Sequence, residues 1–217
     1  MSVKCWYCDV QPLSDPALFY RAMSLLPWEE RREKVLRFRF EKDRQLCLGA
    51  GLLLVQALRQ AGVHDLSLRR LANGKPVLAN CPDIHFNLSH SGRLAVCAVS
   101  GQPVGVDVET PQRADPGVLT MCFQPAEQEW IRDSDDPDRA FTHLWTRKES
   151  CLKLSGAGLS CPLNAFSVLP GKELPGSIFF SEAEAMGHLI CVCTPQREAV
   201  SFKPSPILCP SSGPGGP

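Results

Sequence analysis

The alternation of valines with polar residues around Asp107 most constrains what this 217-residue chain can fold into. A period of two is that of a β-strand, so Val104, Val106 and Val108 would share one face and enter a core. Asp107 and Glu109 would then lie together on the opposite face. Two carboxylates on one strand face suit a hard cation such as Mg²⁺, although a solvated strand edge carries the same pattern.

The remaining patterns indicate an α+β fold. Apolar residues recur at intervals of three and four over 46–61, which predicts an amphipathic helix, and helical patterns also cover 29–44, 138–154 and a short stretch from Pro125. Helices combined with short, mainly antiparallel strands are typical of α+β chains. The strand-like runs are 3–10, 64–71, 84–90, 94–99, 164–169, 177–181, 188–193 and 198–202.

These elements fall into two groups, which predicts an N-terminal lobe over 1–103 and a C-terminal lobe over 104–203. No convincing sequence repeat relates the two groups. Residues 204–217 are rich in Pro, Ser and Gly, and we expect them to form a disordered tail.

Composition narrows the function. Lys plus Arg and Asp plus Glu both number 23, so the chain has no net charge, whereas a protein of bulk nucleic acid is usually basic. An anionic ligand must therefore meet a local basic cluster, and the arginine-rich stretch 31–44 could supply it if it is more than a solvated helix face. No apolar run approaches the ~20 residues that span a bilayer, and no signal-peptide core is present, so we expect a cytoplasmic protein.

The chain has eleven cysteines, most of them within apolar runs. We expect reduced core thiols, since cytosolic chains rarely keep disulfides. Cys5 and Cys8 form a CxxC pair, but no second ligand pair at zinc-site spacing accompanies them.

Three further segments carry residues suited to phosphate chemistry. Glu149 and Lys153 are four apart on a predicted helix, either as a surface ion pair or as a metal ligand beside a phosphate-binding cation. The run 87–92 (NLSHSG) ends a strand with hydroxyl groups, a histidine and a glycine, which can hold an anion, although a structural histidine at a strand end is an equal alternative. The turn 73–76 (NGKP) presents one lysine, although most such turns are only turns.

Taken together, these segments resemble the Sfp-type 4′-phosphopantetheinyl transferase family. The resemblance runs from about residue 27 to residue 170, some two thirds of the chain. The matching text is GKPVL at 74–78, FNLSHSG at 86–92, GVDVE at 105–109, FQPAE at 123–127 and WTRKESCLKLSGAGL at 145–159.

The resemblance implies two similar α+β lobes related by a pseudo-twofold axis, with the active site in the cleft between them and a monomeric enzyme. Coenzyme A would lie in the cleft with Mg²⁺ on its pyrophosphate. The implied metal ligands are Asp107, Glu109 and Glu149, and the implied catalytic residues are Glu149, Lys153 and Asp107. The implied coenzyme A contacts are Arg31, Lys34, Gly74, Lys75, Pro76, Ser89, His90 and Lys153.

The implied reaction is attack by a serine hydroxyl of an apo acyl or peptidyl carrier protein on the β-phosphate of coenzyme A, which releases 3′,5′-ADP. Glu149 is the candidate general base. Glu127 matches an acidic position near the metal, as a ligand or an outer group, and the roles of Glu127 and Arg44 stay open. The resemblance also implies that the carrier is an acidic helical bundle. It could dock on Leu119, Met121 and Phe123, although each of these could equally be a core residue.

Two other functions compete with this one. A catalytically inactive coenzyme A or nucleotide-binding module could share the fold, but all three carboxylates and Lys153 are present. An unrelated Mg²⁺ phosphotransferase would need a phosphate loop, and no GxxxxGK[ST] occurs. The sequence does not choose between fatty-acid, polyketide and nonribosomal-peptide carriers.

Overall fold

The computed structural model describes residues 2–156, 161–171 and 177–208. The helices are η1 (Gln11–Ser14), α1 (Pro16–Ser24), α2 (Glu29–Arg37), α3 (Glu41–Gln60), α4 (Pro116–Cys122), α5 (Pro125–Arg132), α6 (Pro137–Ser155), η3 (Leu163–Ala165) and η4 (Pro206–Leu208). The strands are β1 (Val3–Asp9), β2 (Leu68–Arg70), β3 (Pro76–Leu78), β4 (His85–Ser91), β5 (Leu94–Ser100), β6 (Gly105–Glu109), β7 (Phe179–Ala185), β8 (His188–Thr194) and β9 (Val200–Pro204).

Within the described residues the strands form two main sheets and one hairpin. One sheet has the order β4-β5-β1-β9 and the other has the order β6-β8-β7, while β2 pairs with β3. All pairs are antiparallel except β1 with β9. The α+β prediction is confirmed.

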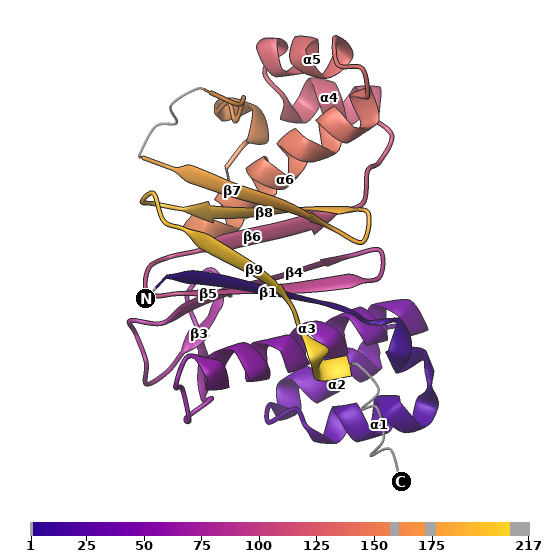
Figure 1. Ribbon diagram of the computed structural model, residues 1–217, viewed down its shortest axis with the longest axis vertical. Helices are drawn as coiled ribbons and strands as arrows, with labels where there is room; N and C mark the ends of the chain where they lie inside the picture. Colours follow the sequence, from indigo (N-terminus) through magenta and orange to yellow (C-terminus); the bar gives the residue numbers. More distant parts are fainter. Residues whose placement is uncertain (1, 157–160, 172–176, 209–217) are drawn as a thin grey trace, which may run out of the picture.

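The two main sheets pack face to face, and helices cover their outer faces (Figure 1). In β1 the side chains alternate between layers: Cys5 faces the second sheet, whereas Trp6 and Cys8 face the helices. Cys5 and Cys8 therefore lie in different cores, which agrees with the prediction of core cysteines. The first lobe is the β4-β5-β1-β9 sheet with α1–α3, and the second lobe is the β6-β8-β7 sheet with α4–α6.

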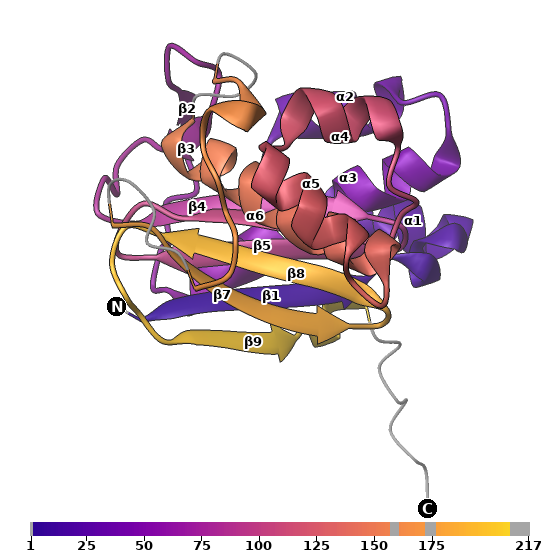
Figure 2. The ribbon, with the colours of Figure 1, turned by 90° about the horizontal axis from the view of Figure 1, so that it is seen from above.

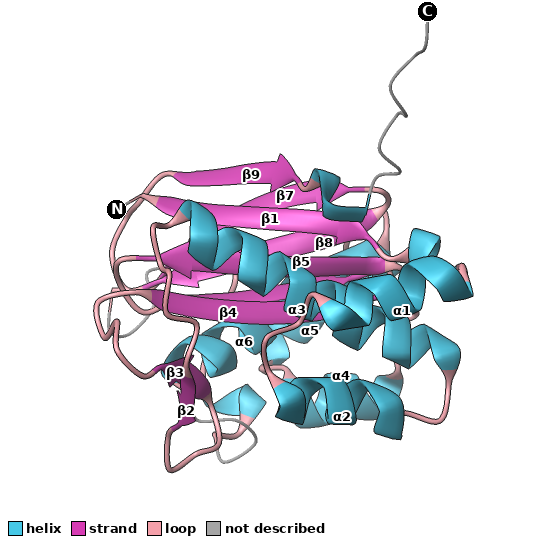
Figure 3. Ribbon diagram, turned by 90° about the horizontal axis from the view of Figure 1, so that it is seen from below, coloured by secondary structure: helices cyan, strands magenta, loops and turns pink. Residues whose placement is uncertain are grey.

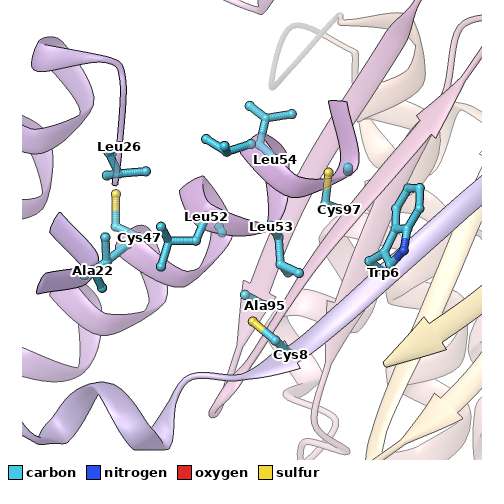
Figure 4. Close-up of a cluster of buried hydrophobic side chains, with 14 of the residues drawn as sticks. Trp6, Cys8, Ala22, Leu26, Cys47, Leu52, Leu53, Leu54, Ala95 and Cys97 are labelled. Atoms are coloured by element: carbon cyan, nitrogen blue, oxygen red, sulfur yellow. The ribbon is translucent and has the colours of Figure 1, made fainter. Parts of the chain in front are cut away.

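Helix α3 forms most of the helical layer of the first lobe. It lies across β1, β5 and β4 (Figure 3) and buries nearly every side chain from Leu46 to Leu58. Figure 4 shows Leu53 near Ala95 and Cys8 of the sheet, while Leu52 lies on the side of Leu26. The periodicity of 46–61 thus marks the correct helix.

In the second lobe, α6 packs directly on β6. The valines Val104, Val106 and Val108 are buried between the sheets, as their alternation predicts. The other face of β6 meets α6 so closely that a Cβ on Gly105 would lie 2.0 Å from the Ser150 carbonyl oxygen. Glycine at this position brings the helix onto the strand face that carries Asp107.

The basic stretch 29–44 is two helices and not one. Helix α2 ends at Arg37, and α3 begins at Glu41 after Phe38 and Phe40, which both have extended backbones. Arg44 closes this break by donating from Nε to the Phe38 carbonyl at 2.7 Å.

Other boundaries also differ from those predicted. The strand expected over 164–169 is replaced by η3 and irregular chain, the strand expected over 177–181 begins at Phe179 and continues to Ala185, and of 64–71 only Leu68–Arg70 is a strand. Helix α4 was not predicted.

The end of the chain returns to the first lobe. Strand β9 lies beside β1 and Leu208 enters the core of the first lobe, where Ser205 Oγ also bonds Gln56 Oε1. Residues 204–208 are therefore folded, contrary to the expectation of a tail beginning at 204. Residues 209–217 lie outside the described residues. No helix in the described part of the chain is long and apolar enough to cross a membrane.

Candidate active site

The two lobes meet along β4 and β6, whose contacts are made by side chains of β4. Asn87 Oδ1 accepts the Val106 N–H at 3.0 Å, and Ser89 Oγ donates to Asp107 Oδ1 at 2.8 Å. Ser91, two residues further, donates to Glu109. Alternate positions of one strand thus orient both carboxylates of the next.

Asp107 is the centre of the site. It is 3% exposed, and its Oδ1 accepts from Lys153 Nζ at 2.7 Å. Lys153 Nζ also donates to Ser89 Oγ at 2.7 Å, so β4, β6 and α6 meet at one point. The other oxygen, Oδ2, is buried and has no hydrogen-bond partner among the described residues. One oxygen of a buried carboxylate is therefore available to a ligand.

Glu109 and Glu149 share the field of Asp107. Burial raises the pKa of both carboxyls above the usual value, and the charge of Asp107 raises each further. Ser91, Lys153 and Gln112 oppose the rise at Glu109, and Lys153 opposes it at Glu149. The positive charge of Lys153 thus only partly offsets the negative charge at these carboxylates.

The donor set fits a hard divalent cation. Carboxylate oxygens are the ligands that Mg²⁺ prefers, Oδ2 of Asp107 lacks a partner, and repulsion between the carboxylates would be relieved by positive charge. Within residues 2–156, 161–171 and 177–208, however, no three acidic, histidine or cysteine side chains already form a metal-binding cluster. The assignment of Asp107, Glu109 and Glu149 as ligands stays a prediction.

A basic group borders the carboxylates. His90 is an exposed residue, yet partial burial lowers the pKa of its imidazole, and the charges of Lys153, Arg31 and Lys34 lower it further. Arg31 lies on Gly51 of α3 and donates to the Cys47 carbonyl at 3.1 Å, while its buried Nε has no partner in the described region. Three of the predicted basic residues, His90, Arg31 and Lys34, therefore lie close enough to one another for their charges to interact.

The predicted turn at 73–76 borders a cavity of about 340 Å³, which Glu149 and Lys153 also line. Gly74 has a φ of +81°, as an Asn-Gly turn requires, and Pro76 begins β3. Lys75 Nζ donates to the carbonyls of Lys153 and Leu154 at 2.7 and 3.3 Å. A cavity of about 430 Å³ on the second lobe, beside Trp130 and His143, contains none of the predicted site residues.

Glu127 lies in the core of the second lobe and has a structural role. It is completely buried, pairs with Lys148 Nζ at 2.8 Å and accepts the backbone N–H groups of Val168 and Gln124. Lys148 also donates to the Leu163 and Phe166 carbonyls. With both oxygens bound inside the lobe, Glu127 is not available as a metal ligand.

The three candidate docking residues differ in their exposure to solvent. Met121 on α4 is 71% exposed, Leu119 packs partly against the core of the second lobe, and Phe123 is 1% exposed. Phe123 is a core residue, and Met121 is the member of the set that faces outward.

Sequence reasoning missed two groups that hold Glu109. Ser91 and Gln112 both donate to Glu109 Oε2. Ser91 could have been found from its spacing, since it follows Ser89 by two on the same strand. The contact of Gln112 depends on the path of the chain after β6 and has no such signal.

Comparisons with known proteins match both lobes. Residues 103–201 match the profile of the 4′-phosphopantetheinyl transferase superfamily, and residues 12–102 match that of the 4′-phosphopantetheinyl transferase N-terminal family. The chain is 36% identical to the 4′-phosphopantetheinyl transferase Sfp of Bacillus subtilis (strain 168) over 180 residues, which cover 76% of this chain and 80% of Sfp.

Two further relatives extend the comparison. The 4′-phosphopantetheinyl transferase psf-1 of Bacillus pumilus is 30% identical over 84% of this chain and 82% of its own length. The human L-aminoadipate-semialdehyde dehydrogenase-phosphopantetheinyl transferase is 29% identical over 62% of this chain and 50% of its own length.

Proposed function

Because this chain belongs to the 4′-phosphopantetheinyl transferase superfamily, we propose that it transfers the phosphopantetheine arm of coenzyme A to a serine of an apo carrier protein, releasing 3′,5′-ADP. Its enzyme class is that of the family. The observation that carries the proposal is the junction of Lys153, Ser89 and Asp107, which joins the two lobes at the predicted cleft.

Asp107, Glu109 and Glu149 are the residues that would hold Mg²⁺. When bound, the ion would neutralise negative charge on the phosphates of coenzyme A. Ser91 and Gln112 hold one oxygen of Glu109, and Ser89 and Lys153 hold one oxygen of Asp107. The carboxylates of Asp107 and Glu109 are therefore held in place before any ligand binds.

Lys153 supplies positive charge at the reacting phosphate. Two of the three donors of its ammonium bond to Ser89 and Asp107, so one donor is left for a phosphate oxygen. A fixed donor of this kind stabilises charge without reorganising during the reaction. Arg31, Lys34 and His90 would bind the remaining phosphates of coenzyme A, with His90 on the 3′-phosphate.

Glu149 is the proposed general base, acting directly or through a water on the carrier serine. Its raised pKa favours this role, because a base is most effective when its pKa approaches the working pH. Gly74, Lys75 and Pro76 would lie beside the nucleotide, on the cavity that Glu149 lines.

The carrier would approach over α4, where Met121 is exposed. A monomeric state and a cytoplasmic location stay predictions, as does the choice between acyl and peptidyl carriers. No comparison supports the alternative of an inactive coenzyme A-binding module.

A transfer assay tests the proposal. The protein is incubated with Mg²⁺, coenzyme A and a panel of apo carriers, and each carrier is weighed by mass spectrometry. We expect a gain of one phosphopantetheine on at least one carrier and a loss of about 10²-fold in rate for Asp107→Asn, by analogy with removal of one transition-state donor. Glu184→Gln, in an exposed ion pair with Arg139, is the control. No mass gain across the panel would contradict the proposal.

A further inference from the structure

A turn of the first lobe binds the end of the helix that carries Glu149 and Lys153. The β2–β3 hairpin extends from the first lobe toward the C-terminal end of α6 (Figures 2 and 3). At its tip, Asn73 Nδ2 donates to the Gly156 carbonyl at 2.7 Å, and Lys75 Nζ donates to the carbonyls of Lys153 and Leu154. The first lobe thus contacts three backbone carbonyls at the helix end.

These bonds satisfy groups that a helix leaves unpaired. The last carbonyls of an α-helix have no partner within it, and the helix dipole makes them attractive to a cation. Within α6, the Leu152 carbonyl receives the N–H of Gly156. Asn73 and Lys75 serve carbonyls beyond that bond, so two side chains from another lobe complete the C-terminal cap of α6.

The same contact lies directly against Gly156. Its φ of +70° lies in the left-handed region that favours glycine, and a Cβ there would meet Asn73 Nδ2 at 2.5 Å. The Cδ of Lys75 would lie 3.6 Å from that Cβ. The backbone conformation of the cap therefore favours glycine, and a larger residue there would displace the Asn73 amide from its bond to the Gly156 carbonyl.

Hydrogen bonds within the first lobe also hold the turn itself in place. Asn73 Oδ1 accepts the Lys75 N–H at 3.1 Å, and the Gly74 N–H donates to the Leu71 carbonyl at 2.8 Å. Arg70 pairs with Glu30 of α2, the helix that also carries Arg31 and Lys34. The hairpin therefore links α2 in one lobe to α6 in the other.

We infer that Asn73 is a positioning residue, which fixes the last turn of α6 and thereby sets Lys153 against Asp107. Lys153 lies within the capped turn, and its own carbonyl is one of the bonded groups. Without the cap the last turn frays, and the ammonium of Lys153 loses its fixed distance from the reacting phosphate. This inference rests on the proposed transferase activity for its kinetic effect, but not for its structural effect.

Two variants of Asn73 separate the contact from the turn. Asn73→Ala removes both side-chain bonds. Asn73→Asp keeps the oxygen that accepts from Lys75 but removes the donor to Gly156. Asn80→Ala is the matched control, because Asn80 bonds Asp65 within the first lobe and does not reach α6.

Hydrogen exchange is measured on the full chain with bound coenzyme A and without it, and transfer kinetics are measured in parallel. For both Asn73 variants we expect the amides of 152–156 to exchange about fivefold faster, the effect of one lost hydrogen bond. We expect kcat to fall about tenfold in both variants, since misplacing a catalytic group by a fraction of an ångström is costly. KM for coenzyme A should change less than twofold in Asn73→Asp, which keeps the bond within the turn beside the nucleotide. Asn80→Ala should leave both quantities unchanged.

Two results would overturn the inference. One is Asn73→Asp with the exchange and kcat of the unmodified chain, which would assign Asn73 to the turn alone. The other is a lower kcat with unchanged exchange at 152–156. If the unmodified chain transfers nothing to any carrier, the exchange measurement still decides whether the cap exists, so the two proposals fail separately.

Discussion

At the scale of the residue, the site is defined by several carboxylates that lie close to one lysine, Lys153. Lys153 is the cation bonded to Asp107, while Glu109 and Glu149 lie in the field of the same carboxylate. A pKa raised in the folded state means that the folded protein binds the proton more tightly than the unfolded chain does. The charged forms of Glu109 and Glu149 therefore destabilise the ligand-free fold above their raised pKa values, and the penalty is lost as the pH falls through them.

We accordingly expect Glu149→Gln to raise the melting temperature of the ligand-free protein at neutral pH by about 2–4 °C, which corresponds to about 1 kcal/mol for a chain of this size. Scanning calorimetry measures the change. With Mg²⁺ and coenzyme A added, the unmodified chain should gain more stability than the variant, because it keeps the carboxylate that a cation would bind. Glu129→Gln, an exposed residue of α5, should change neither value. A lower melting temperature for Glu149→Gln without ligands would contradict the charge argument.

At the scale of the element, α6 is tied to the second sheet through Glu182 of β7. Arg147 donates to Glu182 from both Nε and Nη2, at 2.7 and 2.9 Å, and His143 bonds the same carboxylate. Burial raises the pKa of Glu182, but the bonds from Arg147 and His143 outweigh it and bring the pKa down to about 2. This network anchors a different face of α6 from the one that carries Glu149 and Lys153.

A group with a lowered folded pKa stabilises the protein above its ordinary pKa, here 4.5, and that stability is lost as the pH falls toward about 2. We expect Glu182→Gln to cost roughly 1–2 kcal/mol at pH 7, a figure reduced because the side chain is one-third exposed. Urea unfolding at pH 7 and pH 3 measures it. The difference between the two proteins should shrink at pH 3, and an equal difference at both pH values would rule out the network as its cause.

Sequence patterns predicted the strand and helix that support the site better than they predicted the contacts of individual side chains. The alternating valines of β6 and the periodicity of α3 were sufficient, because burial of one face is a local property of the sequence. The break between α2 and α3 at Phe38 and Phe40 could not be predicted from the local pattern, because the contact that stabilises it comes from Arg44 in the next helix. The resemblance places Glu127 near the metal and leaves its role open, and its buried pairing with Lys148 leaves no mark in the sequence pattern around it.

At the scale of the molecule, the first lobe is completed by the far end of the chain. Strand β9 extends the first sheet beside β1, and Leu208 and Ser205 anchor the segment that follows to the core and to α3. Sequence order alone assigned 198–203 to the second lobe, because nothing in a strand pattern names its partner.

We expect Leu208→Ala to destabilise the whole protein by about 2–3 kcal/mol, the cost of a buried leucine replaced by alanine at a site that can partly relax. Chemical denaturation measures the loss. Lys203→Ala, an exposed change on β9, is the control and should lie within about 0.5 kcal/mol of the unmodified chain. A Leu208→Ala protein as stable as that control would show that the C-terminal segment does not brace the first lobe.

The place of β9 also bears on synthesis at the ribosome. While the chain is being made, the outer side of β1 stays unpaired until residues 200–204 leave the exit tunnel, although β4 and β5 are available much earlier. An unpaired strand edge is a template for wrong pairing. In the nascent protein, the edge of β1 that β9 covers therefore stays open from the synthesis of β1 until β9 emerges, and slow translation between these two strands would prolong the exposure.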